Sequence, residues 1–317
     1  MVINCAEGHV EILLATHNGD RFLQETIDSL VAQTDVPFSL TVSDDSSIDS
    51  SVDIVKKSIG CMPCPVSLLP DLSERLGASG SFSRLLDSSM GSYLMFCDQD
   101  DVWLPNKIRK TLERMLQAEA RYGNGTPILI HTDLKVVDGD LKPIADSFWD
   151  YQNLRPDGRE ALSRLLTQNV VVGCTVMINA SLRELALPIP QKAIMHDWWL
   201  ALVAAAFGRI EHIDDATLLY RQHGNNEIGA KRWGDVRNLT SVATDKVNMK
   251  QSIFNTQVQA KAFLAQYSER LSPHNRQLVE IYASLAQSPK PVRLYKLLKY
   301  KYFKAGILRN FGLFFRI

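Results

Sequence analysis

The stretch Ser92-Tyr-Leu-Met-Phe-Cys-Asp-Gln-Asp-Asp101 decides the fold class, because a short apolar run ends there in a cluster of carboxylates. An apolar run of this length predicts a buried strand. Similar runs occur at 10–16, 39–45 and 127–133, and helical patterns occupy 21–33, 50–57 and 105–120. Strands that alternate with helices in this order predict an α/β fold with a mostly parallel central sheet flanked by helices.

The rest of the chain has a looser pattern. Strands are expected at 170–178, 210–213 and 217–221, with a helix at 197–207, and the sequence is mainly helical in pattern from about residue 250. We therefore expect a main domain over residues 1–240 and a helical C-terminal extension over residues 241–317.

The composition excludes several classes of protein. The 317 residues are 45% hydrophobic and 22% charged, which suits a globular core. The 35 basic residues balance the 35 acidic residues, so bulk charge argues against a general nucleic-acid-binding role. The five cysteines are scattered and form no disulfide framework. With no signal sequence or membrane span visible, we expect a cytoplasmic protein.

Carboxylates gather where two of the predicted strands end. Asp44 and Asp45 close the second strand, and Asp98, Asp100 and Asp101 follow the run at Ser92. In an open α/β sheet, ligands bind outside the carboxyl ends of the strands. Hard oxygen ligands at this spacing suit Mg²⁺ or Mn²⁺, which would in turn hold a diphosphate. A single aspartate at such a place is otherwise a helix cap or turn residue, and Asp101 fits that role.

Two later motifs add candidate site residues. Asp197, in His196-Asp-Trp-Trp199, begins a helical pattern beside two tryptophans, whose apolar rings can wall a sugar and raise the pKa of a carboxyl group. That environment suits a general base, although a first-turn aspartate is also an ordinary helix feature. In Tyr220-Arg-Gln-His223, the histidine suits a metal ligand and Arg221 suits a phosphate. The Gly/Asn-rich stretch that follows, to Gly229, is expected to be a mobile loop.

Other chemistry was weighed against these residues. The chain has no glycine-rich dinucleotide fingerprint, P-loop, metalloprotease motif or nucleophile elbow. Asp98 and Asp100 after an apolar strand fit an aspartyl nucleophile, as in haloacid-dehalogenase-like phosphatases. Those proteins carry the motif after the first strand of the chain, whereas here at least two strands precede it. A phosphoryl enzyme and a non-catalytic nucleotide-sugar- or glycan-binding module remain the alternatives.

The C-terminal tail is basic and aromatic. After Glu280 the chain has no acidic residue, and from Lys290 onward cations alternate with leucines, tyrosines and phenylalanines. Such a segment can lie on an anionic bilayer. The alternative is a helix that packs on the domain with a solvated basic face. We expect contact with the membrane surface, and we expect that removing residues 290–317 spares the main domain.

The motifs together resemble a known family. The sequence is similar to family 2 inverting glycosyltransferases of the GT-A fold, in the rhamnosyltransferase-like branch that builds bacterial surface polysaccharides such as the O-antigen of lipopolysaccharide. The matching segments are Leu13–Gly19, Arg21–Leu23, Ser29–Thr34, Val42–Asp49, Phe96–Lys107, Gly173–Thr175, His196–Trp199 and Tyr220–Gly224. Their order along the chain carries the resemblance, which ends before residue 240.

The resemblance implies a role for each candidate residue. Thr16 and Asn18 would line the base and ribose pocket, Asp45 would hold the nucleotide, and Asp98 would contact the donor ribose or sugar. Asp100 and His223 would bind Mg²⁺ or Mn²⁺, Arg221 would steady the phosphates, and Asp197 would be the base. The tryptophans expected in the acceptor or sugar pocket are Trp103, Trp198 and Trp199. Two departures from the family pattern are His17, where many relatives have tyrosine, and Ser46, where many have glycine.

The implied reaction is a single displacement at the sugar C1 with inversion. The best-supported donor is dTDP-β-L-rhamnose, which would give an α-L-rhamnoside. The implied partners are a glycan or lipid-linked glycan acceptor and the cytoplasmic face of the inner membrane, contacted through the basic tail.

Overall fold

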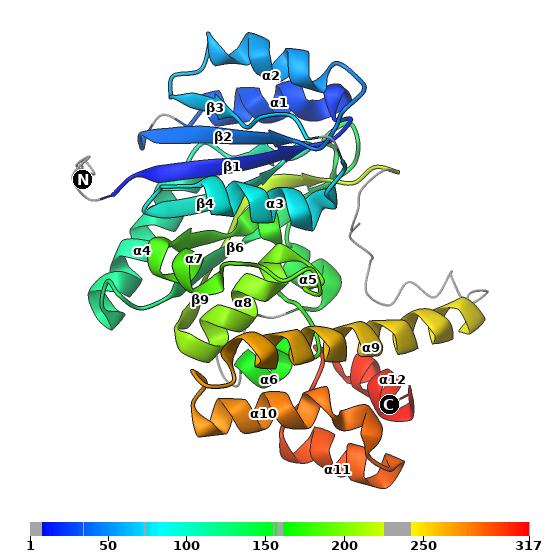
Figure 1. The fold of residues 1–317 in the computed structure, drawn as a ribbon. Coiled ribbons are helices and arrows are strands. Elements are labelled where there is room, and N and C mark those ends of the chain that lie inside the picture. The colour runs from blue at the N-terminus through cyan, green and yellow to red at the C-terminus, as the bar shows by residue number, and fades with distance from the viewer. Residues whose placement is uncertain are drawn as a thin grey trace.

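The structure, a computed structural model, describes residues 8–33, 35–72, 74–154, 156, 161–224 and 242–316. Within these ranges, nine strands form one sheet (Figure 1). The strands are β1 (Val10–Thr16), β2 (Phe38–Asp44), β3 (Val66–Leu68), β4 (Tyr93–Asp98), β5 (Val102–Trp103), β6 (Ile128–Val137), β7 (Pro143–Ala145), β8 (Met177–Asn179) and β9 (Arg209–Arg221).

Helices surround this sheet on its faces and at one end. The helices are α1 (Asp20–Val31), α2 (Ser51–Ile59), α3 (Gly77–Ser88), α4 (Lys107–Tyr122), α5 (Phe148–Gln152), α6 (Ala161–Leu165), α7 (Ala180–Ala186), α8 (His196–Phe207), α9 (Val242–Tyr267), α10 (Pro273–Ala283), α11 (Lys290–Lys299) and α12 (Ile307–Arg316), with 3₁₀ turns at Gly173–Thr175 and Leu285–Gln287. The predicted α/β fold, with a helical C-terminal extension, is confirmed.

The sheet has a parallel half and a mixed half. Its order is β3-β2-β1-β4-β8-β6-β9-β5, and β7 pairs with β6. The pairs among β3, β2, β1 and β4 are parallel, whereas β8 runs antiparallel to both of its neighbours. The expected parallel pattern therefore holds for the N-terminal half, which brings Thr16, Asp44 and Asp98 to one edge of the sheet.

Burial on both faces accounts for the long apolar runs in β1 and β4. In β1, every residue from Val10 to Leu14 is buried, since helices cover both faces of the sheet. Strands that are buried on both faces have continuous apolar sequences. The same holds for Tyr93–Cys97 in β4.

Two sequence expectations differ from the structure. The strand expected at 170–178 is reduced to β8, because a 3₁₀ turn occupies Gly173–Thr175. The two strands expected at 210–213 and 217–221 are one strand, β9. Its register with β6 shifts between Ile213 and Ala216, so an irregularity that skips two residues produces the apparent break in the pattern.

The C-terminal helices, yellow to red in Figure 1, pack against the rest of the molecule rather than standing apart. One hydrophobic cluster includes Trp199 of α8, Phe263 of α9, Tyr282 of α10 and Leu297 of α11. The expected domain border at 240/241 lies outside the described residues, as does the loop expected up to Gly229. Among the helices that the structure describes, none has the length and apolarity needed to span a bilayer.

Candidate active site

A cavity of about 930 Å³ opens at the carboxyl ends of β1, β2 and β4. One wall carries Thr16, Asp45, Asp98 and Asp100 from the strand ends. A second wall comes from the N-terminus of α8 and the segment before it, with His196, Asp197 and Trp198, and a third comes from the C-terminal segment, with Lys304 and Arg309. This volume is typical of a site for a small organic ligand.

Asp45 lines the cavity and also holds the start of α3. Its carboxylate accepts the backbone N–H groups of Leu76, at 2.6 Å, and Gly77, at 2.8 Å. Arg75 lies 3.5 Å from the same carboxylate. These contacts satisfy N–H groups that a helix N-terminus leaves free, so Asp45 fixes the distance between β2 and α3 at the cavity.

The loops after β1 and β2 need unusual backbone angles. Asn18 and Ser46 have φ values of 47° and 61°, in the left-handed region. The Asn18 carboxamide accepts the Ile48 N–H at 2.9 Å and therefore joins the two loops. Asn18 is exposed and does not line the cavity, in contrast to Thr16. Asn18 therefore joins the two loops instead of lining the base pocket, as the resemblance had implied.

Gln99 is a cavity residue that the sequence analysis did not single out. Its Oε1 accepts the hydroxyl of Thr16 and the backbone N–H of His17, each at 2.8 Å. Its amide then donates to the His17 carbonyl at 3.0 Å. A Cβ atom at Gly19 would lie 2.1 Å from Gln99 Oε1, so a larger residue there would displace the Gln99 carboxamide from these hydrogen bonds. The one sequence signal was its position between two acidic residues at a strand end.

The two predicted metal ligands are brought together. His223 Nε2 lies 2.8 Å from Asp100 Oδ2, and both side chains are mostly buried. The His223 ring packs on Phe22, with ring centroids 4.9 Å apart. A carboxylate oxygen suits Mg²⁺ or Mn²⁺, a neutral imidazole is a common metal ligand, and Asp100 faces the cavity. These two residues therefore fit a divalent cation that also contacts a ligand in the cavity.

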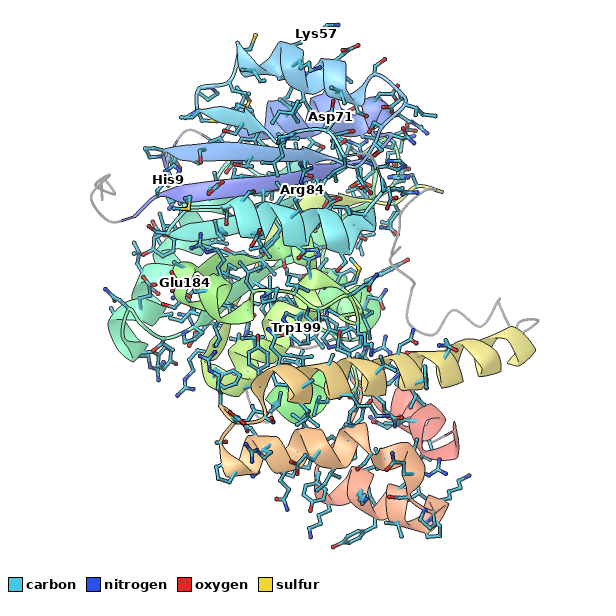
Figure 2. The ribbon with its side chains drawn as sticks, viewed as in Figure 1. His9, Lys57, Asp71, Arg84, Glu184 and Trp199 are labelled. Atoms are coloured by element: carbon cyan, nitrogen blue, oxygen red, sulfur yellow. The ribbon has the colours of Figure 1, made fainter. Side chains whose placement is uncertain are left out.

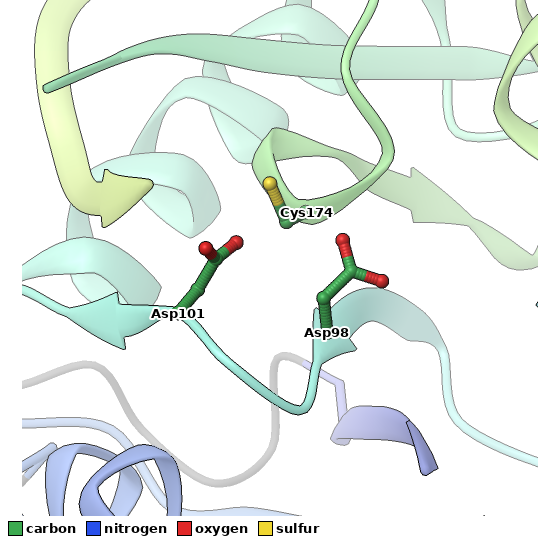
Figure 3. Close-up of side chains that lie close together, drawn as sticks. All are labelled: Asp98, Asp101 and Cys174. Atoms are coloured by element: carbon green, nitrogen blue, oxygen red, sulfur yellow. The ribbon is translucent and has the colours of Figure 1, made fainter. Parts of the chain in front are cut away.

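A second group of potential ligands lies deeper. The ligand atoms of Asp98, Asp101 and Cys174 are within 4.8 Å of one another, and Figure 3 shows the three side chains converging from β4, the loop after it and the 3₁₀ turn. Burial and the neighbouring carboxylates raise the pKa of Asp101, and burial raises that of the Cys174 thiol. Burial also lowers the pKa of nearby Lys107 to about 8. The expected turn residue Asp101 is thus fully buried, and its carboxylate accepts the Arg221 N–H at 3.2 Å.

Arg221 does not reach the cavity. Its guanidinium is 2% exposed, stacks on Phe22 and donates to the carbonyl oxygens of Asp100 and Gly139 and to Glu25. These contacts hold the loop after β4 against the end of β9. The expected role at the phosphates is therefore replaced by one that positions Asp100.

Asp197 occupies the first turn of α8, where it is 8% exposed and lines the cavity. Burial raises the pKa of its carboxyl group to about 6, and hydrogen bonds from Trp198, Asn169 and Gly173 act in the opposite direction. The Trp198 N–H donates to Oδ1 at 2.6 Å. A Cβ atom at Gly173 would lie 3.1 Å from His196 Nε2, so glycine allows this turn to approach α8. The sequence analysis did not identify Asn169.

Only one of the three expected pocket tryptophans lines the cavity. Trp198 does so, and its indole N–H donates to the Leu165 carbonyl at 2.6 Å. Trp199 is fully buried against Phe263 of α9, with ring centroids 5.4 Å apart (Figure 2). Trp103 is 2% exposed, with the Lys107 ammonium over its ring. The period of the α8 helix directs Trp198 and Trp199 to different surroundings, and Trp103 is buried at the end of the short strand β5. The expected place of Trp103 and Trp199 in the pocket is therefore corrected.

Comparisons with known proteins agree with this geometry. A family model described as "Glycosyl transferase family 2" matches residues 11–182, more than half of the chain. The chain is 29% identical over 246 residues to "dTDP-rhamnosyl transferase RfbG" of Shigella flexneri, covering 71% of this chain and 79% of that protein. It is 24% identical over 230 residues to "Putative teichuronic acid biosynthesis glycosyltransferase TuaG" of Bacillus subtilis, covering 71% and 82%.

Solved structures with the same fold cover nearly the whole chain. The mannosyltransferase PcManGT from Pyrobaculum calidifontis, in complex with GDP-Man and Mn2+, has a TM-score of 0.57 at 16% identity, covering 96% of this chain and 78% of that one. S. aureus TarS 1–349, in complex with UDP-GlcNAc, has a TM-score of 0.53 at 16% identity, covering 93% and 88%.

Proposed function

The chain belongs to glycosyl transferase family 2 and has the GT-A fold, and on that premise we propose that it transfers a sugar from a nucleoside diphosphate to a hydroxyl group, with inversion at C1. The observation that supports this most strongly is the placement of Asp197. A carboxylate with a raised pKa lines the same cavity as the acidic residues at the strand ends.

Asp197 is the proposed general base. A pKa of about 6 leaves the carboxyl group ionised at neutral pH and makes it more basic than an ordinary aspartate. It would take the proton of the acceptor hydroxyl as that oxygen attacks C1. The bond between C1 and the diphosphate oxygen breaks on the opposite face, so the nucleoside diphosphate leaves and the configuration inverts.

The strand-end residues are proposed to hold the donor. Thr16 and Asp45 would contact the nucleoside, and Asp98 would contact the ribose or the sugar, since all three line the cavity. Asp100 and His223 would hold Mg²⁺ or Mn²⁺, and a divalent cation there would offset the negative charge of the departing diphosphate. Trp198 would form an apolar wall for the sugar or acceptor.

The finer proposal is that the donor is dTDP-β-L-rhamnose and the product an α-L-rhamnoside of a bacterial surface polysaccharide. Its support is the match to the Shigella flexneri rhamnosyl transferase along most of both chains. The acceptor would be a glycan or lipid-linked glycan.

A thermal-shift screen tests the donor proposal. We would compare dTDP-rhamnose, UDP-glucose, UDP-galactose, UDP-GlcNAc and GDP-mannose, each with Mn²⁺, Mg²⁺ or EDTA. Stabilisation by dTDP-rhamnose that EDTA removes would support both the donor and the metal. Stabilisation by a different sugar nucleotide would contradict only the proposal that the donor carries rhamnose. Equal stabilisation in EDTA would contradict the proposal that a divalent cation helps to bind the donor.

We also propose that the enzyme contacts the cytoplasmic face of the inner membrane through α11. Tyr295 and Leu298 are 59% and 57% exposed on this helix, beside several cations. Replacing both with serine should weaken binding of the full chain to anionic vesicles, since apolar and basic groups together give such affinity. The matched variant Ile48→Ser, at an exposed position outside the tail, should bind as wild type. Unchanged binding of the double variant would contradict the proposal.

A further inference from the structure

Two cations of the C-terminal segment form part of the cavity wall, next to the end of α5 and to residues 167 and 168. Lys304 and Arg309 both line the cavity. Arg309 is half-buried and donates to the carbonyl oxygens of Gln152, at 2.7 Å, and Asn153, at 3.3 Å, at the end of α5. Burial and the positive charge of Arg309 lower the pKa of Lys304. The two cations therefore repel each other inside a partly desolvated wall, which a bound anion would relieve.

Hydrogen bonds fix the turn that presents these cations. Asn310 accepts the Lys304 N–H at 2.8 Å and donates to the carbonyl oxygens of Lys304, at 2.7 Å, and Gly306, at 2.8 Å. Gly306 has a φ of 79°, so the turn before α12 requires a left-handed residue at this point. A turn held at its backbone keeps both side chains directed to the cavity at little entropic cost on binding.

The same turn is tied to the segment that holds Asp197. Thr167 donates its hydroxyl to the Phe303 carbonyl at 3.0 Å, and the Gln168 side chain accepts the Ala305 N–H at 2.9 Å. The next residue, Asn169, makes a hydrogen bond to the Asp197 carboxylate. Three consecutive residues thus connect the cation pair to the proposed base.

We propose that Lys304 and Arg309 bind a phosphate or diphosphate group carried by the acceptor, and so place the acceptor hydroxyl beside Asp197. This inference rests on the proposed function, because Asp197 marks the acceptor side only if it is the base. The donor diphosphate is assigned to the strand-end wall with Asp100, so the cation pair provides a separate anion site. Lysine and arginine are the side chains that most often pair with phosphate.

The test uses the full chain with Mn²⁺ and saturating dTDP, so that the donor site is filled. The probes are geranyl diphosphate, galactose 1-phosphate, inorganic pyrophosphate and uncharged geraniol, measured by calorimetry. The test variant is Lys304→Met with Arg309→Gln, and the control is Lys299→Met with Arg293→Gln, two tail cations that do not line the cavity. Circular dichroism verifies that both variants are folded, and Lys304→Arg with Arg309→Lys tests whether charge alone restores binding.

We expect at least one phosphate probe to bind wild type and the control, and its affinity to fall about tenfold or more in the test variant. The affinity for dTDP should be unchanged in that variant. The inference would be overturned if the folded test variant bound the phosphate probes with unchanged affinity. It would also be overturned if wild type bound geraniol but none of the phosphate probes. A test variant that loses dTDP affinity instead would assign the cations to the donor and would also overturn it.

A separate readout distinguishes this failure from failure of the proposed function. Hydrolysis of the donor, in which water attacks C1 in place of the acceptor hydroxyl and the free sugar is formed, releases the nucleoside diphosphate without an acceptor. Wild type that releases none from any donor would contradict the proposed function, whatever the probes do. If wild type releases the nucleoside diphosphate but the test variant binds the phosphate probes as wild type does, only the proposed anion site is contradicted.

Discussion

At the scale of single residues, the buried carboxyl group of Asp197 carries a cost to folding, and its raised pKa is what the proposed role as a base depends on. The sequence suggested a desolvated carboxylate because two tryptophans follow it. The structure shows that His196 and Asp197 are buried at the N-terminus of α8, while Trp198 is partly exposed and Trp199 packs away from the cavity. Sequence identified the residue and the direction of its pKa change, but it could not show which neighbours enclose it.

The first prediction concerns the pH dependence of stability in Asp197→Asn. The folded-state pKa of about 6 is above the ordinary value of 3.8, so the folded protein binds this proton more tightly than the unfolded chain. Ionisation then costs free energy of folding as the pH rises from about 4 to about 6. The variant should be more stable than wild type by up to about 3 kcal/mol at pH 8 and equal to it at pH 4. Urea unfolding at both pH values measures this, with the exposed Asp140→Asn as control.

The second prediction concerns Ser46, whose backbone lies in the left-handed region. Its φ of 61° costs a residue with a Cβ atom on the order of 1–2 kcal/mol. Ser46→Gly should therefore raise the free energy of unfolding by about 1 kcal/mol. Ser50→Gly, at a φ of −81°, should not raise it. Equal stabilisation by both changes would show that the backbone angle is not the cause.

At the scale of elements, helix α3 depends on a contact that no local pattern reveals. Its sequence, Gly-Ala-Ser-Gly-Ser at the start, is a weak helix former, and no helix was predicted there. Asp45, about 30 residues earlier, supplies the acceptor for its first N–H groups. The strands β1, β2 and β4 were predictable because buried strands have a local signature, whereas the short strand β3 was not predicted. This cap was not, because it joins distant segments.

The third prediction follows from that cap. Asp45→Ala should lower the free energy of unfolding by about 1–2 kcal/mol, the usual effect of removing a helix cap. It should also weaken nucleotide binding, since α3 forms part of the cavity wall. Asp71→Ala, at an exposed aspartate in the segment between β3 and α3, is the control. Wild-type stability and nucleotide affinity in Asp45→Ala would contradict this account of α3.

At the scale of the whole molecule, the C-terminal tail is part of the fold. From the sequence alone, removal of residues 290–317 is expected to spare the main domain. The structure corrects this, because Leu297, Tyr302 and Leu313 are buried in the cluster that includes Trp199. Composition showed the basic and amphipathic character of the tail, but it could not show that the tail closes one wall of the cavity.

A matched pair of neighbouring residues tests this integration and is the fourth prediction. Leu297 is fully buried, whereas Leu298 is 57% exposed. Leu297→Ala should lower the free energy of unfolding by about 2–5 kcal/mol, and Leu298→Ala should change it by less than about 0.5 kcal/mol. Deletion of 290–317 should destabilise the chain further. If the deletion variant had the wild-type melting temperature, the tail would not contribute to the stability of the fold, which would contradict this prediction.

The order of strands along the whole chain argues against the phosphatase alternative. It required Asp98 to follow the first strand of the chain, but Asp98 ends β4, and the family match covers this region. The sequence predicted that one cavity would contain Asp98, Asp100 and Asp197. For the first two, the reason is that ligands bind outside the carboxyl ends of the strands of an α/β sheet, and for Asp197 it is the family resemblance. The positions of Asn18, Trp103 and Arg221 were not, because motif membership does not show which way a side chain faces.

The most direct test of the central claim is the rate of nucleoside diphosphate release from the donor selected in the thermal-shift screen. We would compare wild type and Asp197→Asn in Mn²⁺, between pH 5 and pH 9. The account predicts an acid limb near pH 6 in wild type and a loss of about 10²–10⁴-fold in the variant, with donor affinity retained. A variant that releases the nucleotide at the wild-type rate would contradict the assignment of Asp197 as the base.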